Sequence, residues 1–250
     1  MRIGAGYPQL YKDYGYWPEL SPVSRDEGMP VEGFLDMTAP ETLASAGRFW
    51  RSAQPLILAS KSQGRQLALR QTGIPFIAMP AEIDERALER GVLAKGGGAD
   101  AVVSELARAK ALAISADNPG SLVLGADQAA SCEQRLFGKP GDLTEAAGQL
   151  AFLAGRTHRL HSAAALARDG VVLFETVAHA DMRVRPLSDA FINAYLAAVG
   201  ETALTSAGAY QAEGTGVHLF TAISGDHWTI LGLPLLPVLE ALRREGTLLA

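Results

Sequence analysis

Two short segments of the chain combine residue types that handle phosphates and metal ions. The first, Ser60-Lys61-Ser62-Gln63-Gly64-Arg65, follows a buried apolar run and precedes a predicted helix, so free backbone amides and the helix dipole favour an anion there. The hydroxyls of Ser60 and Ser62 and the cations Lys61 and Arg65 strengthen such a site. The alternative is that Ser62 only caps the helix and the cations are solvated. The segment lacks the Gly-x-x-x-x-Gly-Lys-Ser/Thr pattern, so it is not a P-loop of the usual kind.

The second segment is Gly125-Ala126-Asp127-Gln128, at the end of a short predicted strand. A carboxylate at that place enters the kind of strand-end crevice that holds ligands in open α/β sheets. Asp127 can bind Mg²⁺ there and orient a water molecule. The alternative is an aspartate that serves a turn or a helix cap.

Two lysines and an acidic stretch are further candidates. Lys139 lies in a loop stiffened by Pro140, and Lys110 is the sole lysine of a predicted Ala-rich helix. The acidic stretch follows the second predicted strand and could supply a metal carboxylate, although such loops are most often solvated surface. Its residues are Glu82, Asp84 and Glu85.

A loop of small residues, 206–214, allows the backbone to approach a flat ligand closely, with Tyr210 for packing and Glu213 for hydrogen bonding. A plain reverse turn is the alternative. The histidines lack a paired spacing such as His-Glu-x-x-His, so no metal role is predicted for them. They are His158, His161, His179, His218 and His227.

The elements that must position these residues follow from hydrophobic periodicity and turn signals. Helices interleave with strands of parallel and hairpin type, which predicts an α/β fold with a mixed sheet. The expected strands are 56–59, 76–79, 122–124, 160–166 and 171–184, the last two paired around Arg168-Asp169-Gly170. The expected helices are 66–71, 99–116, 142–153, 188–199 and 233–244.

Residues 1–53 show no sustained period and many prolines and aromatic residues, so we expect an irregular N-terminal extension before one catalytic domain at 54–250. Whether the extension is an ordered arm or disordered stays open. The whole chain has 250 residues and a net charge of −5, which gives no electrostatic case for binding nucleic acid. Cys132 is the only cysteine, which excludes an intrachain disulfide and fits the cytoplasm. The apolar runs are too short to span a membrane.

Taken in chain order, nine stretches resemble the Maf family of nucleoside triphosphate pyrophosphatases, and the resemblance covers residues 55–246. The stretches are Leu56-Ile57-Leu58-Ala59-Ser60, Arg65 with its helix, Ile83-Asp84-Glu85, Leu106-Ala107-Arg108-Ala109-Lys110-Ala111, Gly125-Ala126-Asp127, Gly138-Lys139-Pro140, Gly155-Arg156-Thr157-His158, Ala207-Gly208-Ala209-Tyr210 and Gly232-Leu233-Pro234-Leu235.

The resemblance implies an elongated, two-lobed α/β fold, similar to inosine triphosphatases, with a mixed twisted sheet and the site in a cleft between the lobes. It also implies homodimers and cleavage of a nucleoside triphosphate between its α and β phosphates, with Mg²⁺ or Mn²⁺. Asp127 would activate water, and Glu85 would be its acidic partner at the metal. The residues around the phosphates would be Ser60, Ser62, Arg65, Lys110 and Lys139.

Two departures from the family pattern bear on activity and substrate. Gly64 stands where the family has an arginine, a loss for which Lys61 would compensate. Gln128, and Glu213 in Gln211-Ala212-Glu213-Gly214, resemble the branch that favours 7-methyl-GTP, whereas other residues look like the branch that favours dTTP and UTP. A glutamate facing guanine could accept two hydrogen bonds. The missing arginine also leaves a second hypothesis open, a nucleotide-binding regulator of cell division or septum formation with weakened turnover.

Overall fold

The computed structural model describes residues 48–250, so most of the predicted extension at 1–53 lies outside the described residues. The described part begins against the C-terminal segment. Trp50 forms a β-bridge with Leu248, and the Arg51 amide donates to the Thr247 carbonyl at 2.8 Å. None of the helices in residues 48–250 has the length and apolar character needed to cross a membrane.

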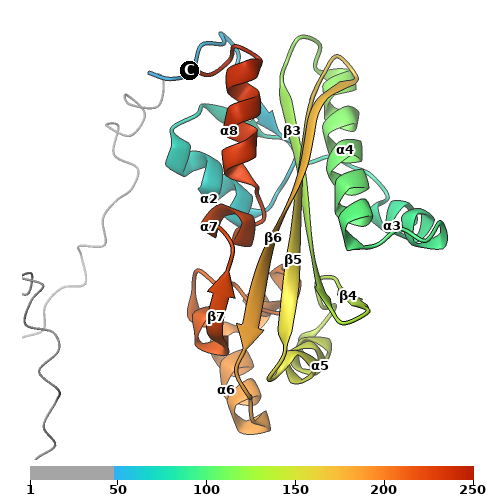
Figure 1. Cartoon of the computed structure of the whole chain (residues 1–250), viewed down its shortest axis with the longest axis vertical. Coiled ribbons are helices and arrows are strands. Elements are labelled where there is room, and N and C mark those ends of the chain that lie inside the picture. Colours follow the sequence, from blue (N-terminus) through green and yellow to red (C-terminus); the bar gives the residue numbers. More distant parts are fainter. Residues whose placement is uncertain (1–47) are drawn as a thin grey trace, which may run out of the picture. The chain divides into compact units, whose positions relative to one another are not determined.

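A mixed sheet of seven strands organises the described residues, with the order β2-β1-β3-β5-β6-β7 and β4 paired to β3 (Figure 1). The strands β2, β1 and β3 run parallel, and the remaining neighbours are antiparallel. The predicted α/β class with a mixed sheet is therefore confirmed. The strands are β1 (Leu56–Leu58), β2 (Phe76–Ala78), β3 (Val123–Cys132), β4 (Arg135–Phe137), β5 (Thr157–Arg168), β6 (Val171–Val184) and β7 (Phe220–Ser224).

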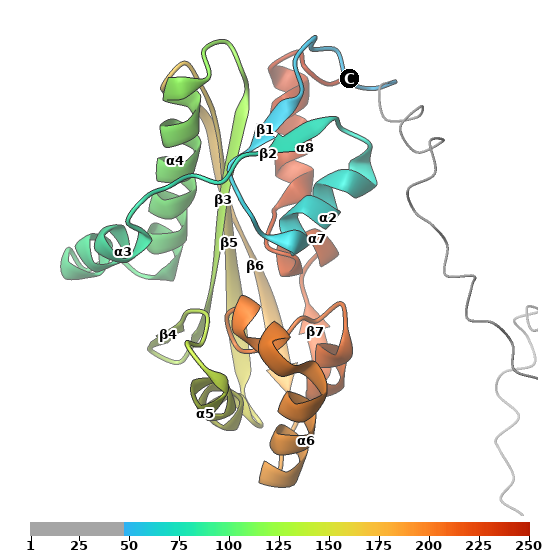
Figure 2. The same cartoon turned by 180° about the vertical axis from the view of Figure 1, so that it is seen from behind.

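Helices cover both faces of this sheet. In Figure 1 and, from behind, in Figure 2, α2 and α8 lie on one side and α3 and α4 on the other. The α-helices are α2 (Gln63–Thr72), α3 (Glu85–Ala94), α4 (Ala99–Asp117), α5 (Leu143–Leu153), α6 (Asp189–Val199), α7 (His227–Ile230) and α8 (Leu235–Arg244). Two 3-10 helices are η1 (Gly200–Thr205) and η2 (Thr215–Leu219).

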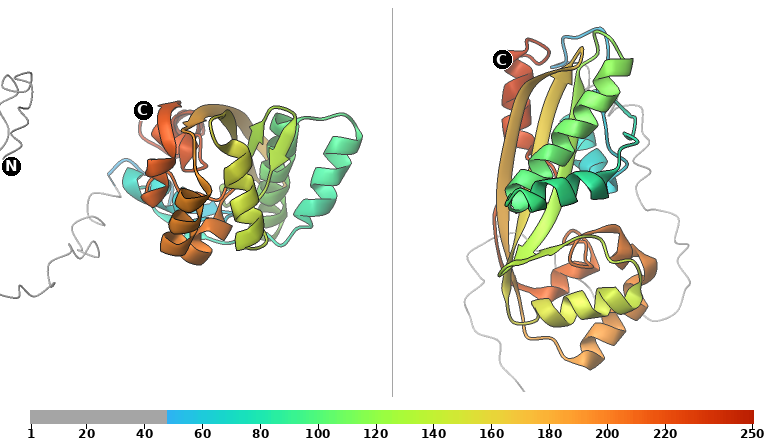
Figure 3. Two further views of the ribbon diagram at one scale, coloured as in Figure 1. Left: turned by 90° about the horizontal axis from the view of Figure 1, so that it is seen from below. Right: turned by 90° about the vertical axis from the view of Figure 1, so that its right-hand side faces the viewer.

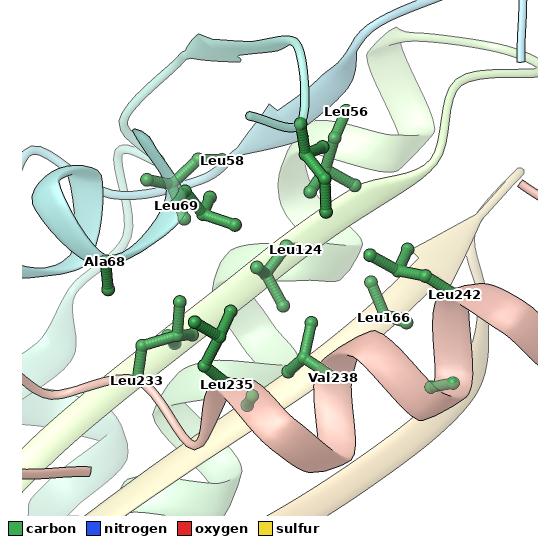
Figure 4. Packing of buried hydrophobic residues seen from close by; sticks show 14 of the residues in the cluster. Leu56, Leu58, Ala68, Leu69, Leu124, Leu166, Leu233, Leu235, Val238 and Leu242 are labelled. Atoms are coloured by element: carbon green, nitrogen blue, oxygen red, sulfur yellow. The ribbon is translucent and has the colours of Figure 1, made fainter. Parts of the chain in front are cut away.

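Two hydrophobic cores lie along the face that carries α2 and α8. The first core joins β1, β3 and β5 to these two helices, with buried leucines facing each other across the layers (Figure 4). The second core lies toward the other end of β3, β5 and β6, where α5 and α6 are grouped (Figure 3). On the opposite face, small residues such as Ala163 and Ala165 allow α4 to pack close to the strands. The long strands thus hold two packed regions with a gap for a site between them.

Every predicted helix and strand is present, but the structure also has elements that were not predicted, among them β4, α7 and the two 3-10 helices. β3 was expected to end at residue 124 but continues to Cys132. Glu85 was taken as part of an acidic loop but begins α3, and Asp84 caps this helix by accepting from the Ala87 amide at 2.9 Å. The strand β7 was not predicted. Small or polar residues extend β3, so this extension lacks the apolar pattern on which prediction depends, whereas α3 has an apolar face but no buried residue.

His158 of β5 is buried beside Tyr210, and its Nε2 lies 2.5 Å from the tyrosine hydroxyl. Its Nδ1 has no hydrogen-bond partner in the described part of the chain. Burial lowers the pKa of His158 to about 4 from the usual 6.5, because the imidazolium would lose its hydration.

This shift predicts a loss of stability in mild acid. The unfolded chain protonates His158 as the pH falls through 6.5, while the folded protein does not until about pH 4, so the penalty grows within that window and is constant below it. Between pH 7 and pH 5 we expect this residue to reduce the free energy of unfolding by about 2 kcal/mol. Urea denaturation at both pH values measures it. In His158→Gln the free energy of unfolding should fall by about 2 kcal/mol less between pH 7 and pH 5 than in wild type. An equal decrease in both proteins would contradict the assignment of this effect to His158.

Candidate active site

The loop between β1 and α2 has the geometry of an anion site. Ser60 follows directly after the strand, and its hydroxyl accepts from the Ser62 amide at 3.2 Å. Ser62 occupies the N-cap position of α2, but its side chain makes no capping hydrogen bond. The alternative that Ser62 only caps the helix is therefore not supported by the geometry. Its hydroxyl stays available beside the amides at the helix N-terminus, which attract negative charge.

Arg65, in the first turn of α2, is buried with its guanidinium directed at this loop. Its Nε donates to the Gly232 carbonyl at 2.9 Å and its Nη1 to the Ser60 hydroxyl at 3.0 Å. Burial lowers the pKa of Arg65, with Asp127 and Glu85 acting in the opposite direction. Within residues 48–250, Arg65 forms no ion pair. A buried guanidinium that has only neutral hydrogen-bond partners favours an anionic ligand.

Asp127 lies within β3 and not at its end, which corrects the predicted position. The edge of β3 is nevertheless open beside Asp127 as expected, because β1 pairs with β3 only as far as Leu124, three residues earlier. Beyond that point the side chain of Asp127 faces α4, where Lys110 donates to its Oδ1 at 2.6 Å. Lys110 also lies 3.1 Å from Glu85 Oε1, at the start of α3. The buried ammonium therefore joins two carboxylates that are far apart in the sequence.

Gly125 explains how α4 comes close enough for this contact. A Cβ at residue 125 would lie 2.6 Å from the Ala111 nitrogen and closer still to the Ala107 carbonyl oxygen. Because backbone atoms of α4 occupy that space, only glycine allows this approach of helix and strand. Lys110 lies on the same turn of α4 and reaches Asp127 as a result.

Lys139, in the loop after β4, is exposed, whereas Arg65 and Lys110 are buried. Its partial burial in the site, together with repulsion from Arg65, Lys110 and Lys61, lowers its pKa, and Glu85 opposes this change. Burial is the largest cause, and the three cations that add to it show that Lys139 lies within a cluster of positive charge. Such a cluster is suited to a polyanion.

The predicted residues line two adjacent cavities. The first, of about 640 Å³, contains Ser60, Glu85, Lys110 and Asp127. The second, of about 810 Å³, contains Glu213 and lies between the two hydrophobic cores. Both cavities are lined by the same five residues at their junction. These are Lys61, Ser62, Arg65, Gln128 and Lys139.

Gln128 is the junction residue that was not among the predicted site residues. Its Nε2 donates to the Ser162 hydroxyl at 2.9 Å and to the Thr229 carbonyl at 3.0 Å. It therefore ties β3 to β5 and to α7 next to Arg65. The available signals were its place directly after Asp127 and its resemblance to the branch that favours 7-methyl-GTP, but neither predicts these contacts.

The packing around residue 64 explains why this chain has a glycine there. A Cβ there would lie 2.8 Å from the Leu231 carbonyl oxygen, so α2 packs directly on the backbone after α7. An arginine at residue 64 would require that backbone to shift. The absence of this cation therefore reflects local packing, and Lys61, which lines both cavities, supplies a charge nearby.

Cations line the junction of the two cavities, two carboxylates line the first cavity, and the second cavity is roomy. This arrangement defines an α/β protein that binds a phosphorylated ligand beside a carboxylate pair. The chain belongs to the family described as Maf-like protein, which matches residues 55–245.

This chain aligns with nearly the whole length of each of three curated relatives. It is 53% identical over 201 residues to a nucleoside triphosphate pyrophosphatase of Rhodopseudomonas palustris, covering 80% of this chain and 98% of the relative. It is 50% identical over 199 residues to a protein of the same name from Nitrobacter winogradskyi, with the same coverage. It is 52% identical over 193 residues to a 7-methyl-GTP pyrophosphatase of Rhizobium etli, covering 77% of this chain and 97% of the relative.

Proposed function

We propose that this chain hydrolyses a nucleoside triphosphate to the monophosphate and pyrophosphate. The observation that carries the proposal is the contact of Lys110 with both Asp127 and Glu85, beside a junction lined by Arg65 and Lys139. Phosphoryl transfer needs positioning and neutralisation of charge more than covalent help, and this arrangement offers both. The names of the relatives support the same activity.

The two carboxylates fit a divalent cation. Asp127 and Glu85 both approach one positive group, the Lys110 ammonium, at 2.6 and 3.1 Å, so their oxygens converge on a small volume. Carboxylate oxygens are the ligands that Mg²⁺ and Mn²⁺ prefer. When bound there, such an ion neutralises phosphate charge and lowers the pKa of water.

The residues of the chain itself have separate tasks in this proposal. Arg65, Lys139 and the amides after Ser60 hold the phosphates at the junction of the cavities. Asp127 accepts a hydrogen bond from the attacking water, whose oxygen bonds to the α phosphorus while the bond from that phosphorus to the bridging oxygen breaks. The electron pair of the broken bond leaves with pyrophosphate, and the proton that the water loses passes through Asp127 to solvent. Lys110 keeps Asp127 oriented toward the first cavity.

The direct test is incubation of the protein with Mg²⁺ or Mn²⁺ and a panel of nucleoside triphosphates, with detection of pyrophosphate. Release of pyrophosphate and monophosphate in equal amounts supports the proposal. Tight binding of a triphosphate without any product would instead support the nucleotide-binding regulator. The close packing of Gly64 against Leu231 gives the missing arginine a structural explanation, so its absence alone is no argument for the regulator.

We propose that the base enters the second cavity, where Glu213 accepts hydrogen bonds from a guanine-type ring. Glu213 and Glu201 both line this cavity, on opposite sides of Tyr210 in the sequence. We expect Glu213→Gln to raise KM for 7-methyl-GTP by about 10-fold or more and to change KM for UTP and dTTP less, because the amide nitrogen faces the ring donors. KM measured for each nucleotide tests this. A change of base preference in Glu201→Gln and none in Glu213→Gln would contradict the assignment.

A pH dependence follows from Lys139. Because its pKa is lowered below 10.5, its ammonium loses the proton at a lower pH than an ordinary lysine. We expect KM for the triphosphate to rise as the pH increases into the alkaline range, since a neutral amine no longer attracts phosphate. Lys139→Arg retains its charge and should show a flatter rise. KM against pH at constant metal concentration compares the two proteins, and parallel curves would rule out Lys139 as the titrating group.

We also propose that the chain forms homodimers and acts in the cytoplasm, as the resemblance to the family implies. Light scattering during size-exclusion chromatography measures the dimer directly. A monomeric mass at micromolar concentration would exclude it.

A further inference from the structure

A second cluster of potential metal ligands lies outside both cavities. Asp100 in the first turn of α4, His161 of β5 and His179 of β6 each offer one ligand atom, and these atoms all lie within 4.8 Å of one another. None of the three residues lines the candidate active site. His161 pairs across the sheet with Ala129, two residues beyond Asp127, so the cluster occupies a separate place on the α4 face.

The hydrogen bonds of the cluster resemble those of a site built for an ion. Asp100 Oδ1 lies 2.6 Å from His161 Nδ1 and 2.8 Å from His179 Nε2, so both rings converge on one carboxylate oxygen. His161 is buried, and its other nitrogen lies 2.7 Å from the Ser131 hydroxyl. A hydrogen bond at the second ring nitrogen fixes the orientation of an imidazole that ligates a metal.

The charged side chains near Asp100 form ion pairs elsewhere, so its carboxylate contacts the two histidines. Asp181, next on the same face of β6, is bound by Arg159 through two hydrogen bonds of 2.7 and 3.0 Å. Asp100 forms ion pairs only with His161 and His179 among the described residues. No lysine or arginine of the described chain forms an ion pair with Asp100, and Arg159, which its charge also affects, is held by Asp181.

We propose that Asp100, His161 and His179 bind a divalent transition metal ion of the zinc class. Imidazole nitrogen is a ligand of Zn²⁺ and of its first-row neighbours, whereas Mg²⁺ selects oxygen. In a tetrahedral zinc site, bond lengths of about 2.0–2.2 Å place the ligand atoms about 3.4 Å apart. The Asp100 oxygen lies 2.6 and 2.8 Å from the two imidazole nitrogens, so each of these two distances needs to lengthen by less than about 1 Å, and the exposed Asp100 and His179 are free to do so.

The consequence for the protein is structural. One ligand belongs to α4 and the other two to adjacent strands, so an ion there ties the start of the helix that carries Lys110 to the β5–β6 pair. The remaining coordination position faces solvent, because Asp100 and His179 are both exposed. The bound ion should therefore raise the melting temperature without being required for catalysis.

Zinc retention tests the proposal in the full-length protein. After incubation with Zn²⁺ and dialysis against buffer with excess Mg²⁺, which competes for the catalytic carboxylates, we expect the wild-type protein to retain one zinc per chain. Cobalt replaces zinc in such sites and gives a visible absorption band characteristic of imidazole ligands in low coordination. We expect this band in wild type and an increase in Tm on adding Zn²⁺.

His179→Ala removes one exposed ligand and should abolish zinc retention, the cobalt band and the Tm increase. His218→Ala is the matched control, since His218 is an exposed histidine outside the cluster, and it should behave as wild type. Should His179→Ala fail to fold, Asp100→Asn keeps the shape and weakens the site. Wild-type protein without zinc, or equal retention by the cluster variants and wild type, would overturn the proposal.

Discussion

The Asp127→Asn protein is expected to hydrolyse its triphosphate with a kcat about 100- to 10,000-fold below that of wild type. Asparagine has nearly the same shape, but it lacks the negative charge that Lys110 contacts at 2.6 Å and that a metal ion and a polarised water require. KM should change far less, because Arg65, Lys139 and the loop after β1 hold the phosphates independently. Initial rates of pyrophosphate release over a range of substrate concentrations separate the two parameters.

Asp189→Asn provides the matched control. Asp189 is an exposed aspartate in the first turn of α6 and lines neither cavity. Its replacement removes the same charge by the same change of atoms and should leave kcat unchanged. A folded Asp127→Asn protein with the kcat of wild type would exclude Asp127 from the chemistry.

The Gly125→Ala protein is expected to lose about 3 kcal/mol of folding free energy or more, together with most of its activity. The added methyl group would lie 2.6 Å from the Ala111 nitrogen, and the backbone of α4 cannot move aside as a flexible side chain would. The helix must withdraw from β3, and Lys110 withdraws from Asp127 with it. Urea denaturation measures the first effect and pyrophosphate release the second.

Gly148→Ala distinguishes crowding from a general effect of the substitution. Gly148 lies within α5, and a Cβ at that position would meet nothing within 4 Å. Alanine should therefore stabilise the helix by about 0.5–1 kcal/mol. If both variants had the same stability as wild type, the close contact of α4 with β3 would not be a constraint on residue 125.

The parts of the fold that sequence predicted well are those with a strong apolar period or a clear turn. The hairpin of β5 and β6 has a turn at Asp169 and Gly170, both with positive φ, between two long runs. The extension of β3 beyond Leu124 lacked such a signal, because Ala126, Gln128 and Ser131 have no strand preference of their own. Pairing with β5 along the whole strand determines its length, and that is a tertiary effect.

The residues of the candidate site also divide into those that the sequence could predict and those that it could not. Arg65 follows a buried strand and Asp127 follows a short apolar run, so both could be recognised locally, whereas the contact of Glu85 with Lys110 depends on α3 packing beside α4. The histidine cluster had no sequence signal at all. His161 and His179 are 61 and 79 residues from Asp100, so spacing along the chain says nothing of their proximity.

The position of Lys110 between Asp127 and Glu85 also bears on the order in which ligands arrive. In the free protein the Lys110 ammonium already contacts both carboxylates, so a divalent ion alone must displace it in order to enter. A triphosphate attracts the ammonium toward its own oxygens and releases the carboxylates. We therefore expect positive thermodynamic linkage, in which metal and nucleotide each increase the affinity for the other by the same factor. The internal ion pairs would then keep the protein from holding metal when no nucleotide is present.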